Sequence, residues 1–208
     1  MNDHERATHW DDIYRQKQDD VSWFEAEPIR SLALVDRCDL SRDAAVIDVG
    51  GGRSRFVEGV LDRGFHDVTV LDLSAVALED TRARLGDRAA HVRFRVGDVT
   101  RFEPTERYAL WHDRAVFHFL ASAGEREAYA RVLEQAVPPG GHVILATFAP
   151  DGPERCSGLP ALRYDGEALA RALGPVVHLV EEIRHEHRTP AGKVQPFTFA
   201  RFVRRAVG

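Results

Sequence analysis

A run of three glycines directly after an apolar segment is the part of this sequence best suited to bind a ligand. Residues 46–49 precede Gly50–Gly52, and a second apolar segment, 68–71, ends at Asp72. Glycines after a buried strand let a ligand approach the backbone closely. A carboxylate at the end of the next strand can accept hydrogen bonds from ribose hydroxyls. The spacing therefore predicts a site for a nucleotide-type ligand.

Three ligand classes compete for this site. A phosphate-binding loop needs Lys and then Ser or Thr after its last glycine, whereas Arg53 and Ser54 follow here with the wrong spacing. A dinucleotide fingerprint needs a third glycine where Arg55 stands. S-adenosylmethionine (SAM) has no phosphate and needs close backbone contact along its amino-acid tail, a carboxylate for the ribose and an adenine slot. The residues therefore favour SAM.

The hydrophobic pattern predicts strands that alternate with helices from residue 44 onwards, after two N-terminal helices that end near Cys38. The expected strands are 45–49, 67–72, 91–96, 108–112, 143–148, 176–188 and 195–205. The expected helices between them are 53–63, 74–85, 122–137 and a short one capped by Asp165, while 149–163 has no periodicity. This order predicts a Rossmann-like, doubly wound α/β fold. Its mostly parallel seven-stranded sheet ends in a C-terminal antiparallel hairpin.

Composition is typical of one globular domain. The chain has 208 residues, 44% of them hydrophobic, and a net charge of −5. We expect a single domain over 1–208, with an N-terminal helical cap (1–43), a SAM-binding core (44–148) and a substrate segment (149–208). No basic stripe favours nucleic acid and no apolar run favours a membrane partner, so we expect a cytoplasmic protein. The oligomeric state stays open.

Four landmarks appear in the order typical of one enzyme family. Asp48–Gly52 resembles the first motif of the class I SAM-dependent methyltransferases. In that family an acidic residue after the second strand binds ribose, a Gly-Asp pair lies beside adenine, and Pro-Gly-Gly precedes the fifth strand, as Pro139–Gly141 does here. The alternative is an α/β protein whose glycines serve only turns. The resemblance implies these cofactor-binding residues: Asp48, Gly50, Gly51, Gly52, Asp72, Leu73, Gly97, Asp98 and Val99.

Aromatic residues near the N-terminus, Trp10 and Trp23, resemble the first segment of some small-molecule and protein-lysine methyltransferases. Such rings could cover the cofactor and attract its cationic sulfonium by about 0.5–2 kcal/mol. We therefore add both tryptophans to the cofactor-binding set. Packing of the N-terminal helices onto the sheet explains them equally well.

Further segments extend the resemblance to an uncharacterised bacterial methyltransferase subfamily. They are Trp111–Arg114, Cys156–Pro160 and His187–Gly192. The resemblance implies no particular methyl acceptor, so O, N, S and a metalloid all stay open as the methylated atom.

The catalytic group is expected after the fourth strand. Methyl transfer needs a general base only if the acceptor arrives protonated. His112 is the first candidate, with Asp113 and Arg114 beside it at the strand tip. Alternatively, Asp113 and Arg114 form a structural ion pair and His112 binds backbone.

The acceptor is expected to meet the irregular segment 149–163, which we interpret as a lid. His185 and His187 share one face of a strand, and with Cys156 they offer a weak alternative as a metal site; we predict no metal. The expected substrate-facing residues are His118, Cys156, Tyr164, His185 and His187.

The sequence as a whole predicts a SAM-dependent methyltransferase that acts on a small molecule, because no appended domain is available to hold a macromolecule. A protein-lysine methyltransferase is the alternative within the enzyme class. A non-catalytic protein that binds SAM or S-adenosylhomocysteine (SAH) and a dehydrogenase are the other hypotheses.

Overall fold

A computed structural model describes residues 3–17 and 21–206 of the chain. Its strands are β1 (Val46–Val49), β2 (Val68–Asp72), β3 (Val92–Val96), β4 (Leu110–Arg114), β5 (His142–Phe148), β6 (Arg155–Cys156), β7 (Leu159–Pro160), β8 (Val177–Arg188) and β9 (Val194–Arg204). Its α-helices are α1 (Asp3–Lys17), α2 (Ile29–Asp36), α3 (Phe56–Asp62), α4 (Ala75–Leu85), α5 (Ala123–Ala136) and α6 (Gly166–Leu173). The 3₁₀ helices are η2 (Gly86–His91), η3 (Val99–Arg101), η4 (Phe117–Phe119) and η5 (Gly174–Val176).

Seven of the strands form one sheet in the order β3-β2-β1-β4-β5-β9-β8. The five strands from β3 to β5 are parallel, whereas β9 pairs antiparallel with both β5 and β8. The strand order reverses between β1 and β4, the place where sheets of this kind bind ligands beyond their carboxyl ends. The predicted Rossmann-like fold with a C-terminal hairpin is confirmed.

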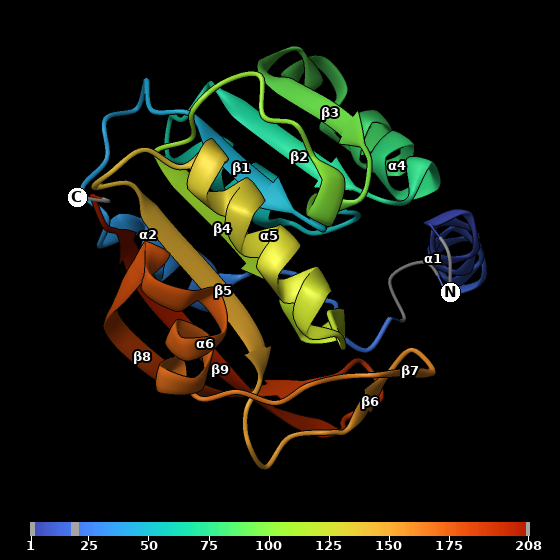
Figure 1. The fold of residues 1–208 in the computed structure, drawn as a ribbon. Coiled ribbons are helices and arrows are strands. Elements are labelled where there is room, and N and C mark those ends of the chain that lie inside the picture. The colour runs from blue at the N-terminus through green and yellow to red at the C-terminus, as the bar shows by residue number, and fades with distance from the viewer. Residues whose placement is uncertain (1–2, 18–20, 207–208) are drawn as a thin grey trace.

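Helices cover both faces of the sheet (Figure 1). On one face α2, α3 and α4 pack on a core that includes Phe56 and Val46. On the other face α5 and α6 pack on a second core around Trp111 and Tyr129. No helix among the described residues is long and apolar enough to span a membrane.

Capping residues in the sequence correctly predict where three of the helices begin. Ser122 and Glu125 form the predicted capping box of α5. The side chains of Ser74 and Asp165 accept hydrogen bonds from backbone N–H groups at the starts of α4 and α6. These bonds satisfy donors that the first helical turn leaves unpaired, so the helices begin where the sequence predicts.

The fourth strand differs from the prediction. It covers Leu110–Arg114 rather than 108–112, because Tyr108 is buried without belonging to the strand and its N–H donates to the Ala136 carbonyl. Arg114 therefore ends the strand, and His112 lies in its middle.

The segment 149–163 is not wholly irregular. The short strands β6 and β7 form an antiparallel hairpin, and Arg163 pairs with Phe148 at the end of β5. In Figure 1 this hairpin lies below the carboxyl ends of the central strands, and α1 lies beside them. Two segments distant in sequence therefore flank the same edge of the sheet.

Replacement of Tyr129 by Phe tests the buried network that joins α5 to β4. The Tyr129 hydroxyl accepts from Trp111 Nε1 (2.7 Å) and donates to Asp113 Oδ2 (2.8 Å). Tyr129→Phe leaves Trp111 Nε1 unpaired and removes one of the hydrogen bonds to the buried Asp113 carboxylate. We therefore expect it to lower the free energy of unfolding in urea by about 2 kcal/mol. Tyr108→Phe, which removes a hydroxyl whose bond to Glu106 is longer, at 3.3 Å, is the control. Equal losses in the two variants would contradict this assignment.

Candidate functional site

A cavity of about 450 Å³ opens at the carboxyl ends of the parallel strands. Side chains from α1, from the loops after β1 to β4 and from the β6–β7 hairpin line it. They are Arg6, Trp10, Tyr14, Trp23, Val49, Gly50, Leu71, Asp72, Leu73, Gly97, Asp98, Val99, Arg114, Ala115, Val116, Phe119, Leu120, Ala121, Glu125, Cys156, Leu159 and Pro160. The lining is mostly apolar with a few polar groups, which is typical of a small-ligand site.

The glycine run borders this cavity. Its glycines are needed for packing against neighbouring side chains as well as for ligand access. Gly50 and Gly52 have positive φ angles of 65° and 39°. A Cβ atom at Gly50 would overlap the Val116 side chain, and one at Gly52 would overlap the Tyr14 hydroxyl. Gly50 lines the large cavity, whereas Asp48 and Gly51 line an adjoining cavity of about 30 Å³. Gly52 lines neither of these two cavities.

Asp72 lies in the large cavity at the end of β2. Its side chain is buried, and its Oδ1 accepts from the backbone N–H of Ser74 at 2.8 Å. Burial, reinforced by the nearby charges of Asp48 and Asp11, raises the pKa of Asp72 to about 7. A ligand that donates hydrogen bonds or carries positive charge would stabilise the ionised form.

Gly97, Asp98 and Val99 line the cavity at the end of β3. Asp98 Oδ1 accepts from the backbone N–H and the hydroxyl of Thr100, at 2.8 and 2.7 Å. Its Oδ2 lies 3.7 Å from the Arg6 guanidinium. The loop after β3 is therefore held in a fixed shape beside the cavity.

Aromatic rings from separate segments cover the site. Trp10 contacts Trp23 and Phe119 edge to face, with ring centroids 5.7 and 5.2 Å apart. Tyr14 contacts Trp23 at 6.2 Å and also lines the cavity. Sequence reasoning did not assign Tyr14 or Phe119 to the site. Because residues four apart share a helix face, the spacing of Tyr14 from Trp10 was a signal for it.

His112 does not line the large cavity. Its Nδ1 lies 2.7 Å from Asp48 Oδ1, its Nε2 lies 2.8 Å from the Ser31 hydroxyl, and its ring stacks on Phe56 with centroids 3.7 Å apart. The ring is 1% exposed. The prediction that His112 lies at the strand tip is wrong, because the strand ends two residues later.

Asp113 and Arg114 project to opposite faces of β4 and form no ion pair with each other. Asp113 accepts from the backbone N–H groups of Val116 and Phe117 and from the Tyr129 hydroxyl, which orders the turn after the strand. Burial raises the pKa of Asp113 to about 6 despite these bonds. Arg114 lines both cavities.

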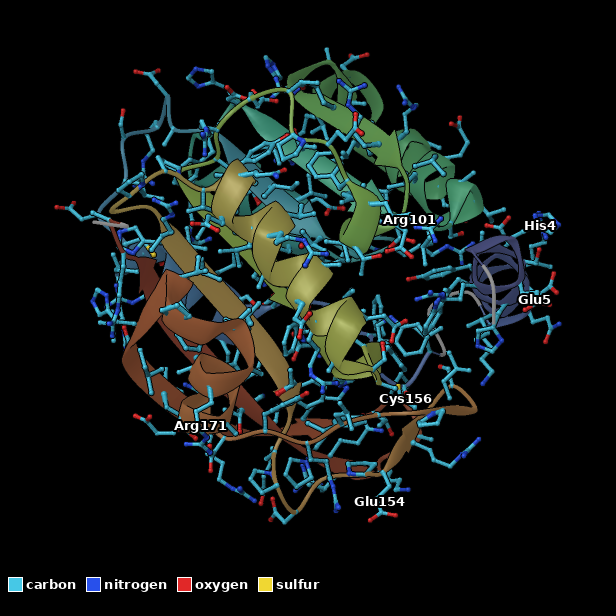
Figure 2. The ribbon with its side chains drawn as sticks, viewed as in Figure 1. His4, Glu5, Arg101, Glu154, Cys156 and Arg171 are labelled. Carbon is cyan, nitrogen blue, oxygen red and sulfur yellow. The ribbon has the colours of Figure 1, made fainter. Side chains whose placement is uncertain are left out.

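Only one of the five predicted substrate-facing residues, Cys156, lines the large cavity. Figure 2 labels its side chain on the β6–β7 hairpin. His118 and Tyr164 are buried elsewhere, and His185 lies near Arg30 on the surface. His187 is buried against the segment before α2. Within residues 3–17 and 21–206, no cluster of three or more His, Cys, Asp or Glu side chains is placed to hold a metal ion.

Comparisons with known sequences agree with this geometry. Residues 46–141 match a family model described as a methyltransferase domain. Nodulation protein S from Bradyrhizobium diazoefficiens is 29% identical over 143 residues, or 69% of this chain. That alignment covers 66% of the relative, just under two thirds of its length.

Solved structures share the fold over almost the whole chain. The N-methyltransferase NodS from Bradyrhizobium japonicum, in complex with SAH, has a TM-score of 0.71 at 18% identity and covers 95% of this chain and 99% of its own. The 1,6-didemethyltoxoflavin-N1-methyltransferase from Burkholderia thailandensis has a TM-score of 0.75 at 21% identity, with 99% and 92% covered. The chain therefore has the Rossmann-like fold that these methyltransferases share.

Replacement of Asp72 by Asn tests the electrostatics of the ligand-free site. The folded protein holds the Asp72 proton up to about pH 7, whereas the unfolded chain releases it near pH 4. Ionisation of Asp72 therefore destabilises the folded state progressively as pH rises from about 4 to about 7. Asp72→Asn removes this effect and keeps the oxygen that accepts from Ser74.

We expect Asp72→Asn to be more stable than the wild type at about pH 8, by up to about 4 kcal/mol, and closer to it at about pH 4. Urea unfolding without ligand at several pH values measures the difference. A difference that stays constant with pH would contradict the raised pKa.

Proposed function

We propose that this protein is a SAM-dependent methyltransferase that acts on a small molecule. The observation that carries the proposal is the cavity at the strand ends, where Gly50, Asp72 and Asp98 follow one another along the edge of β1, β2 and β3. The match of residues 46–141 to a methyltransferase domain covers these three positions.

Each part of SAM has a suitable group in this cavity. The ionised Asp72 carboxylate accepts hydrogen bonds from the ribose hydroxyls, while Leu73, Asp98 and Val99 bind the adenine. The methionine tail extends past Gly50 towards the small cavity, where Asp48 Oδ2 is buried without a hydrogen-bond partner. That oxygen is placed to accept from an ammonium group.

Three aromatic side chains line the part of the cavity where the sulfonium of SAM would bind. Trp10, Tyr14 and Trp23 line the cavity together with Gly50 and Arg114. Their π systems favour a cation, which the sulfonium supplies. Exclusion of water by these rings also strengthens the nearby charge interactions.

The same cavity limits the size of the acceptor. Cys156, Leu159 and Pro160 from the β6–β7 hairpin line this cavity, as do the N-terminal aromatic residues Trp10, Tyr14 and Trp23. A small molecule fits between them. NodS is named as an N-methyltransferase and the Burkholderia enzyme as an N1-methyltransferase, and the latter was solved with bound 1,6-didemethyltoxoflavin and SAH.

The chemistry is an in-line displacement, in which alignment of nucleophile and methyl group supplies much of the acceleration. We propose that His112 positions Asp48 rather than removing a proton, because Asp48 and Ser31 occupy both of its ring nitrogens. Asp113 orders the turn that holds Phe117 and Val116 against the site. Arg114 is the member of the predicted catalytic group whose side chain reaches the cavity.

Ligand-dependent thermal unfolding tests the cofactor. SAH at about 100 times its Kd should stabilise the folded protein by about 2.7 kcal/mol and raise Tm by about 5–10 °C, since only the native state binds it. NAD should leave Tm unchanged; the opposite pattern would favour a dehydrogenase.

Incubation with labelled SAM tests the reaction. We expect SAH to form with a library of small metabolites, and label to enter extractable small molecules. Transfer of label into protein bands of a lysate would favour a protein methyltransferase instead. SAH binding without turnover by either substrate type would favour a binding protein.

Replacement of His112 by Asn separates the two roles of this residue. We expect stability to fall by about 1–3 kcal/mol, because Asn cannot contact both Asp48 and Ser31. The pH profile of kcat/KM should keep its shape. If kcat/KM fell steeply and the acidic limb of the profile disappeared while folding was retained, His112 would be the base after all.

A further inference from the structure

The small cavity beside the main one is lined by side chains whose buried polar atoms have no hydrogen-bond partner. Its volume is about 30 Å³, and it shares Trp23, Gly50 and Arg114 with the large cavity. Such a volume is room for about two water molecules. It is too small for a nucleoside, but a ligand in the large cavity can extend one small polar group into it.

Two carboxylates that line the small cavity each have an oxygen without a donor. Asp48 Oδ1 lies 2.7 Å from His112 Nδ1, whereas Asp48 Oδ2 is buried without a hydrogen-bond partner. Glu25 Oε1 lies 3.1 Å from Arg114 Nη2 and 3.4 Å from His187 Nδ1. Glu25 Oε2 is also buried without a partner. Buried polar atoms are usually hydrogen-bonded, and an ammonium group could donate to both oxygens.

Arg114 supplies donors of the opposite kind. Its Nη1 donates to the Trp23 carbonyl at 2.7 Å. Its Nε and Nη2 are buried without an aligned hydrogen-bond partner, although Nη2 lies 3.1 Å from Glu25 Oε1. These two nitrogens form one edge of the planar guanidinium, and such an edge can bind both oxygens of a carboxylate. The carboxylate-binding edge of Arg114 is therefore unsatisfied.

The charges of Glu25 and Arg114 compensate each other only in part. Burial lowers the pKa of Arg114, and the neighbouring charge of Glu25 does not fully offset this shift. Burial also opposes ionisation of Glu25, but Arg114 and His187 outweigh it and lower the pKa of this carboxyl group. Both groups are therefore charged, and each would be stabilised by a further partner of opposite charge.

Arg53 also lines the small cavity, but its donors have partners elsewhere. Its Nε donates to Asp80 Oδ2 at 2.7 Å, and its Nη1 donates to the Tyr14 carbonyl at 2.9 Å. Among the described residues that line the small cavity, the buried side-chain atoms without a hydrogen-bond partner belong to Glu25, Asp48 and Arg114. They comprise acceptors for a cation and donors for an anion, which together suit a zwitterion.

We propose, on the basis of the proposed methyltransferase function, that the small cavity is the subsite for the α-amino-acid end of the methyl donor. Arg114 binds the carboxylate of this end, and Glu25 binds its ammonium together with Asp48. Arg114 is thus a cofactor-binding residue rather than the catalytic one that the sequence predicts. The subsite selects a donor that carries both charges, because a ligand without one of them leaves buried polar atoms unpaired.

Four adenosine thioethers test the subsite by calorimetry. SAH carries both charged groups, decarboxylated SAH lacks the carboxylate, deamino-SAH lacks the ammonium, and methylthioadenosine lacks both. We expect SAH to bind the wild type at least about 10-fold more tightly than each of the other three. Absence of SAH binding would refute the methyltransferase function itself. If SAH binds but decarboxylated SAH or deamino-SAH binds equally well, only the subsite is overturned.

Two variants pair each side chain with one group of the ligand. Arg114→Gln should reduce the preference for SAH over decarboxylated SAH by about 10-fold or more, because the variant loses the contact that this analogue already lacks. Glu25→Gln should reduce the preference for SAH over deamino-SAH by about 5-fold or more, for the same reason. Arg201→Gln breaks a comparable pair with Glu181 on β9 (2.6 Å) and is the control that should leave all four affinities unchanged.

A purely structural role of the Glu25–Arg114 pair has a different signature. Both variants would then weaken the four ligands alike and leave the two preferences unchanged, which would overturn the proposal. If Arg114→Gln does not fold, the wild-type preferences and the Glu25→Gln variant decide. An unchanged preference for SAH over deamino-SAH in Glu25→Gln then counts against the subsite.

Discussion

The buried bond between Asp48 and His112 is the interaction on which the site depends. It links neighbouring positions on β1 and β4, the two strands where the order of the sheet reverses. The other ring nitrogen of His112 forms a hydrogen bond with the Ser31 hydroxyl on α2. A carboxylate this deeply buried is stable only when it is paired and hydrogen-bonded. The pair therefore keeps the glycine turn, the end of β4 and the covering helix in one arrangement, and the cavity is formed between them.

Near this bond, two buried carboxyl groups of the ligand-free site, those of Asp72 and Asp48, lack full compensation. Asp72 has a raised pKa and Asp48 has an unpaired buried oxygen. Such groups destabilise an empty protein. They become favourable when a ligand supplies ribose hydroxyls, an ammonium group and a sulfonium. The raised pKa of Asp72 and the unpaired oxygen of Asp48 are thus the features of the empty site that the proposed cationic methyl donor would compensate.

The sequence predicts well which residues meet at the carboxyl edge of the parallel strands. Gly50, Asp72 and Asp98 each follow an apolar strand, and parallel strands bring such ends to one edge. The caps at Ser74, Ser122 and Asp165 are local signals of the same kind. The tip of β4 was misplaced because Tyr108 is as apolar as a strand residue, although it packs just outside the strand. Because the strand ends two residues later than predicted, His112 lies within the strand, between Asp48 and Ser31.

The contacts around Arg114 could not be predicted in the same way, because distant segments create them. Glu25, Arg114 and His187 share no pattern along the chain. His187 reaches Glu25 because β8 joins the edge of the sheet beside β9. The histidines at 185 and 187 looked equivalent by strand periodicity. Yet the segment before α2 buries His187 against Ser22 and Glu25, while His185 remains near Arg30 on the surface. The contacts of Glu25 with Arg114 and His187 are therefore tertiary contacts, and no local motif in the sequence predicts them.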